Sequence, residues 1–71
     1  MTTFTVTHRM TDDEGRPFGW HIAGYKKSFA EDAKNVRARI RKQIRAKLDA
    51  LGVGNNDFPS REAAEAVLAR F

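Results

Sequence analysis

Cysteine is absent from this sequence of 71 residues, proline occurs only twice, and tryptophan and tyrosine occur once each. The lack of cysteine excludes disulfide bonds and thiolate metal ligands together. No apolar run is long enough to cross a bilayer. The first ten residues also lack the basic start and apolar core of a signal peptide. We therefore expect an intracellular, cytoplasmic protein that has no membrane partner.

The length predicts a single domain, residues 1–71, with a small hydrophobic core. Domains of this size often depend on disulfides, a metal or a second subunit for stability. Because thiol chemistry is excluded, oligomerisation or close helix packing is the remaining support. The size therefore favours a homodimer or a complex with another protein.

Positive charge is concentrated in one segment, Lys34 to Lys47, which reads KNVRARIRKQIRAK. This segment holds seven basic residues and no acidic one, whereas the rest of the chain holds six basic and nine acidic residues. The net charge of +4 is thus +7 from the segment and −3 from the remainder. Charge gathered in this way predicts a polyanion or an acidic surface as partner.

The N-terminal third alternates with a period of two, which is typical of strands. Residues 2–10 and 18–25 are predicted to form an antiparallel β-hairpin around a polar loop that contains Gly15 and Pro17. Alternation places Phe4, Val6, His8 and Met10 on one face, together with Phe18, Trp20 and Ile22 of the second strand. The pairing would leave two open strand edges, on which another chain could add.

Two helices are predicted after the hairpin. Ser28 and Glu31 form a capping box for a long helix over about 29–51, which the pair Leu51-Gly52 ends. Its apolar stripe recurs at spacings of three and four and consists of Phe29, Ala33, Val36, Ile40, Ile44, Leu48 and Leu51. After a flexible connector, Ser60 caps a shorter helix over about 61–70. The fold class expected is a small α+β domain of order β-β-α-α.

On a helical wheel the basic residues form a strip beside the apolar stripe of the long helix. The candidate binding residues on this strip are Lys34, Arg37, Arg41, Lys42 and Arg45. Like charges four residues apart destabilise a helix, and an anion placed opposite them would relieve that repulsion. The alternative interpretation is a solvated helix face with no ligand.

The outer face of the hairpin is a second candidate surface. It combines short or polar side chains with one basic residue: Thr3, Thr5, Thr7, Arg9, His21 and Tyr25. Such a β-ribbon suits the groove of a nucleic acid, but it also describes an ordinary solvent-facing strand. Lys26 and Lys27 lie between the two surfaces, where they are placed to contact phosphates or simply to aid solubility.

Chemistry beyond binding is not indicated. We find no nucleophile paired with a base and no glycine-rich phosphate loop. The two histidines, His8 and His21, fall on opposite faces of the predicted hairpin, so no metal site is expected. We therefore expect no catalytic residue, no metal and no cofactor, and we expect that the protein is not an enzyme.

The order hairpin-then-helix resembles small DNA-binding modules such as integrase arm-binding domains and excisionase-like proteins. Those modules usually have a third strand or a winged arrangement, which this sequence does not show. The run Tyr25 to Arg37 resembles the strand-to-helix junction of HicB-type antitoxins. Small size and the lack of cysteine also fit phage or mobile-element proteins, including anti-CRISPR inhibitors. These resemblances carry over no functional residue.

Two functions follow as expectations. The first is a small regulatory or architectural protein that binds nucleic acid through the basic helix face, with strongly salt-dependent affinity. The alternative is a protein-binding module or inhibitor, antitoxin-like or anti-CRISPR-like, which docks on an acidic partner surface. Binding to an anionic membrane is disfavoured, because the apolar helix face is needed to cover the hairpin.

Overall fold

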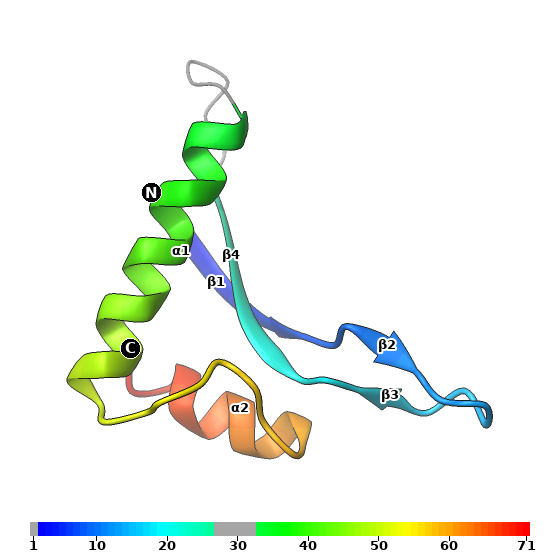
Figure 1. Cartoon of the computed structure of the whole chain (residues 1–71). Helices are drawn as coiled ribbons and strands as arrows, with labels where there is room; N and C mark the ends of the chain where they lie inside the picture. The colour runs from blue at the N-terminus through cyan, green and yellow to red at the C-terminus, as the bar shows by residue number, and fades with distance from the viewer. Residues whose placement is uncertain (1, 27–32) are drawn as a thin grey trace.

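The computed structural model describes residues 2–26 and 33–71 (Figure 1). Four strands precede two helices, and together they form the small α+β fold that the sequence predicts. The elements are β1 (Thr2–Thr7), β2 (Met10–Thr11), β3 (Pro17–Phe18), β4 (His21–Lys26), α1 (Ala33–Ala50) and α2 (Arg61–Leu68). Within the described residues, no helix is long and apolar enough to cross a membrane.

The hairpin is a broken ladder rather than the continuous one that was predicted. β1 pairs with β4 from Thr2 opposite Lys26 to Thr7 opposite His21, and β2 pairs with β3 beyond a gap. In the gap the Arg9 N–H lies 3.2 Å from two carbonyl oxygens, those of Phe18 and Gly19. Gly19 has a φ of +73°, which favours glycine. The gap holds two residues of each strand, His8 and Arg9 opposite Gly19 and Trp20, so the register is the same on both sides of this break in the ladder.

Beyond this break the hairpin leaves the body of the molecule as an arm, residues 10–18 (Figure 1). Met10 and Phe18 are opposed across the arm and are 60% and 45% exposed. The prediction that both residues share the buried face with Phe4 was therefore wrong, because the arm carries them past the helices that cover β1 and β4 (Figure 1). At the tip, the Asp12 carboxylate accepts hydrogen bonds from the N–H groups of Glu14 (2.9 Å) and Arg16 (2.8 Å).

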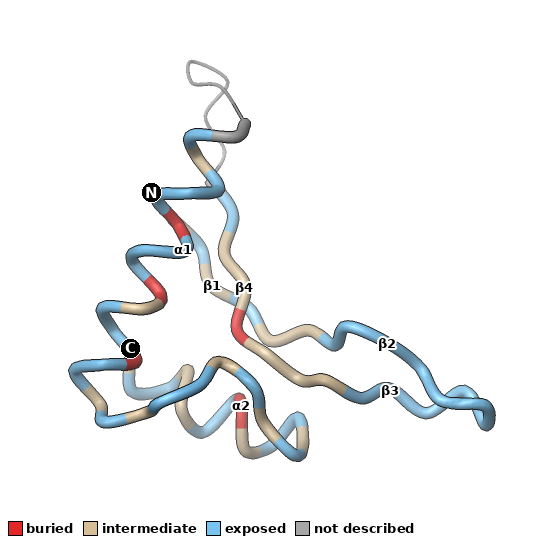
Figure 2. Tube along the Cα trace, in the orientation of Figure 1, coloured by how far each residue is buried: buried red, intermediate tan, exposed pale blue. Residues whose placement is uncertain are grey.

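The core lies where α1 and α2 meet the β1–β4 pair (Figure 2). Ile22, Ile40, Ile44, Leu48 and Ala64 are buried in it. The three α1 residues among them confirm the centre of the predicted apolar stripe. Phe29, which was assigned to the same stripe, lies outside the described residues.

Local sequence signals set the described helix ends. Gly52 has a φ of +75° and donates to the Asp49 carbonyl at 3.1 Å, while the Val53 N–H donates to the Leu48 carbonyl at 2.9 Å. These two bonds form a Schellman cap, so α1 ends one residue before the predicted position. Ser60 caps α2 as predicted and accepts from the Ala63 N–H at 3.1 Å. The predicted cap of the long helix at Ser28 and Glu31 lies outside the described residues.

The connector between the helices, residues 52–59, is fixed to the edge of β4 that faces away from β1. The Asn56 side chain accepts from the Ile22 N–H and donates to the Ile22 carbonyl, both at 2.8 Å. Next to it, the Phe58 N–H donates to the Trp20 carbonyl at 2.8 Å. The connector expected to be flexible is therefore held by the Asn56 side chain and by a single bridge between Phe58 and Trp20, and it covers part of one predicted open edge.

Candidate anion-binding groove

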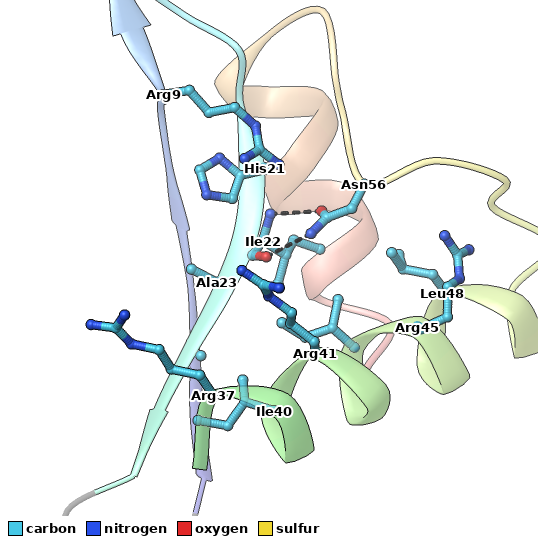
Figure 3. Close-up of a pocket in the computed structure, with 12 residues that line it drawn as sticks. Arg9, His21, Ile22, Ala23, Arg37, Ile40, Arg41, Arg45, Leu48 and Asn56 are labelled. Carbon is cyan, nitrogen blue, oxygen red and sulfur yellow. Dashed lines mark hydrogen bonds between the residues drawn. The ribbon is translucent and has the colours of Figure 1, made fainter. Parts of the chain in front are cut away.

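Four arginines border one hollow of about 420 Å³ between β4 and α1 (Figure 3). We call this hollow the basic groove. Arg9, at the base of the arm, and three residues of α1 supply the positive charge: Arg37, Arg41 and Arg45. Its other lining residues are His21, Ile22, Ala23, Gly24, Ile40, Ile44, Leu48 and Asn56.

Helix geometry explains why the arginines of α1 meet the groove. Ile40, Ile44 and Leu48 face the core, and Arg37 and Arg41 lie one position beyond Val36 and Ile40. An advance of about 100° per residue carries them to the rim of the buried face, beside β4. Both arginines are exposed, and they lie about 6 Å apart along the helix axis at 1.5 Å per residue.

Arg9 reaches the same groove from the hairpin. A Cβ atom added at Gly19 would lie 3.2 Å from the Arg9 Cβ, so the glycine leaves room for this side chain. The His21 ring lies beside it, with Nδ1 3.2 Å from the Gly19 carbonyl oxygen. The glycine at the break in the ladder therefore makes room for an arginine that the sequence assigned to a separate surface.

The open edge of β4 adds backbone groups to the groove. Ile22 directs its N–H and carbonyl away from β1, toward Asn56. Strand geometry repeats every two residues, so the N–H and carbonyl of Gly24 point the same way. Gly24 also lines the groove, and its missing side chain lets Ile40 pack on the strand.

Arg45 belongs to the groove but is engaged within the chain. Its Nε and Nη2 contact the Asp49 carboxylate at 3.0 and 2.9 Å. Its Nη2 and Nη1 also donate to the carbonyls of Val53 (2.6 Å) and Gly54 (3.1 Å). Arg45 therefore fastens the connector to α1, a structural role that the charge pattern did not reveal.

Replacing Arg45 should consequently affect stability, whereas replacing Arg41 should not. We expect Arg45→Ala to lower the melting temperature by about 5 °C, because about 1 kcal/mol is lost with these partly exposed bonds. Arg41→Ala is the matched control on the same helix. Thermal unfolding followed by circular dichroism measures both variants, and equal melting temperatures would contradict the role of Arg45.

The remaining positive charge of the groove is not neutralised within the described part of the chain. The described acidic residues form ion pairs with arginines outside this set or with Arg45: Glu14 with Arg16, Asp49 with Arg45, and Glu65 with Arg61. Arg9, Arg37 and Arg41 form no ion pair with any described acidic residue. Three guanidinium groups from two elements thus share one concave surface, which favours an anionic ligand.

The other candidate residues are placed differently. Lys42 is exposed on α1 and does not line the groove. The side chains of Lys26 and Lys34 and all of Lys27 lie outside the described residues. Sequence reasoning missed Asn56 and Gly24 as parts of the groove, and it assigned His21, like Arg9, to the outer face of the hairpin. Asn56 gave no local signal, since its partner Ile22 is 34 positions away.

No family model, curated protein or solved structure matches the chain. The function is therefore interpreted from the geometry and charge of the groove.

Proposed function

We propose that the protein binds nucleic acid through the basic groove and acts as a small regulatory or architectural protein inside the cell. The observation that carries this proposal is the convergence of Arg9, Arg37 and Arg41 on one hollow without a described acidic partner. Guanidinium groups form bidentate hydrogen bonds with phosphate and remain charged at any cellular pH.

The electrostatics of α1 support the same conclusion. Arg37 and Arg41 are four residues apart, where like charges repel and weaken the helix by a few tenths of a kcal/mol. Phosphates bound between them would turn this repulsion into attraction and release counterions. The contacts would involve the backbone of the nucleic acid, so binding should depend strongly on salt and weakly on sequence.

A salt titration of binding to a labelled mixed-sequence duplex, and to one of its strands alone, tests the proposal. For the wild type we expect the affinity to fall linearly with salt on a log–log plot. Arg37→Ala/Arg41→Ala should weaken binding about tenfold or more at low salt and reduce the slope by about 1–2. Fluorescence anisotropy measures both quantities.

Arg61→Ala/Arg70→Ala is the matched control, because it removes the same charge from α2 and the C-terminal turn, away from the groove. Its affinity should stay within about threefold of the wild type, since only long-range attraction is reduced. An equal loss of affinity in both double variants would show that binding depends on net charge and not on the basic groove. No binding by the wild type at low salt would refute the proposal.

The alternative function is docking on an acidic protein surface. The exposure of Met10 and Phe18 on the arm favours it, because apolar side chains on a projecting ribbon suit protein contacts better than phosphates. A stoichiometric protein complex together with absent nucleic-acid binding would select this alternative.

A further inference from the structure

The arm lacks a packing partner. It consists of two strands of two residues each. Met10 exposes more than half of its surface there, and Phe18 exposes nearly half. A two-stranded ribbon is marginally stable in water unless its apolar side is covered. In Figure 1 the arm points away from both helices, so the body of the same molecule does not cover it. Met10 and Phe18 are therefore open to contact by another molecule.

Charge indicates which surface fits the arm. Its tip carries Asp12, Asp13 and Glu14 against a single basic residue, Arg16. The basic groove carries the opposite charge through Arg9, Arg37 and Arg41. Opposite charges on two parts of one chain are self-complementary, which is the requirement for an interface with two-fold symmetry.

We propose that two copies of this chain exchange arms, each acidic tip docking in the basic groove of the other copy. Arg9 and His21 line the groove and also flank the base of the arm. The arm therefore starts where the groove ends. Two arms that run antiparallel about a two-fold axis then bring each tip to the other copy's groove, and they place Met10 and Phe18 between the protomers.

The dimensions of arm and groove agree. From Arg9 to Asp13 the arm spans about 13 Å at 3.3 Å per residue. From Arg37 to Arg45 the helix wall of the groove spans about 12 Å. The inference does not depend on nucleic-acid binding, but the two partners would compete, since both need Arg37 and Arg41.

A charge-swap experiment tests the exchange. Variant A is Asp13→Lys/Glu14→Lys, and Asp12 is retained because its carboxylate holds the turn. Variant B is Arg37→Glu/Arg41→Glu. Sedimentation equilibrium at low salt measures the dissociation constant of the dimer. The wild type should dimerise, and the dissociation constant of each variant alone should be about tenfold higher. An equimolar mixture of A and B should recover the wild-type affinity, because both of its arm–groove contacts are again complementary.

The control is Asp57→Lys/Glu62→Lys, an equal charge change at two exposed residues away from the arm, which should leave the dimer unchanged. Met10→Ser/Phe18→Ser provides a second test. This variant should weaken the dimer at high salt as well, since the two side chains that it removes contribute apolar contacts. Circular dichroism confirms that each variant is folded. A monomeric wild type at about 500 µM, a dimer insensitive to variant A, or a mixture of A and B that stays dissociated would each overturn the exchange.

Discussion

Asn56→Ala is expected to lower the free energy of unfolding by about 2–4 kcal/mol, a large share of the stability of so small a domain. The Asn56 amide forms two hydrogen bonds of 2.8 Å with the backbone of Ile22, a residue that is only 1% exposed. Without this amide, one donor and one acceptor lose their partners beside the core. Each unsatisfied buried group costs about 1–3 kcal/mol, and entry of water reduces the total.

Urea unfolding followed by circular dichroism measures this loss. Asn55→Ala is the matched control, because Asn55 is the same residue type one position earlier and is exposed. Its free energy of unfolding should change by less than about 0.5 kcal/mol. Asn56→Asp should also be less stable than Asn55→Ala, since a carboxylate still accepts from the Ile22 N–H but sets a second acceptor against the Ile22 carbonyl. Equal stabilities of Asn55→Ala and Asn56→Ala would show that the connector does not support β4.

Gly24→Ala is expected to cost about 2 kcal/mol of stability, although alanine is otherwise well tolerated in place of glycine. An added Cβ atom would lie 2.6 Å from the Ile40 Cγ2 and 3.1 Å from the Phe4 Cδ1. Ile40 is buried and β-branched, so its χ1 angle cannot adjust freely. The strand and α1 would have to separate, which would loosen the core and widen the basic groove.

Gly54→Ala is the control for this substitution. Nothing lies within 4 Å of a Cβ added at Gly54, and its φ is not positive. We therefore expect no loss there, and a gain of up to about 1 kcal/mol from the reduced entropy of the unfolded chain. Opposite signs for the two variants in the same urea titration would support the close approach at Gly24. Similar values for both would contradict it.

The parts of the fold that depend on local patterns could be predicted from the sequence. Ile40, Ile44 and Leu48 recur with the helical period, and the period alone assigns them to the core. Ser60 and Gly52 act through bonds to residues three positions away, so their roles as caps are also legible in the sequence.

The break in the ladder at Arg9 and Gly19 could not be predicted in the same way. Alternation carries a face assignment along a strand only while the ladder is unbroken. The positive φ of Gly19 accompanies a break in the ladder that does not shift the register, and the arm beyond it leaves Met10 and Phe18 outside the core. The glycine itself was the available signal, because an isolated glycine weakens a strand pattern and often marks an irregularity in it.

The candidate site was predicted in part. A helical wheel places Arg37, Arg41 and Arg45 on the same side of α1. It therefore could not distinguish the two exposed arginines from Arg45, which fastens the connector. The spacing of Arg45 and Asp49, four residues apart, was the sequence signal for that difference. The convergence of Arg9 with α1 depends on tertiary structure and has no counterpart in the local pattern.

The Lys47 amine contacts two aromatic rings outside the basic groove. Its Nζ lies 5.9 Å from the centroid of the Phe4 ring and 5.7 Å from that of Phe71, and these two rings meet edge to face. The rings attract the ammonium form through their negative faces. Acetylation of Lys47 would remove the positive charge from this pair of rings. A modification remote from the groove would thus loosen the contact between β1 and the C-terminal end of the chain.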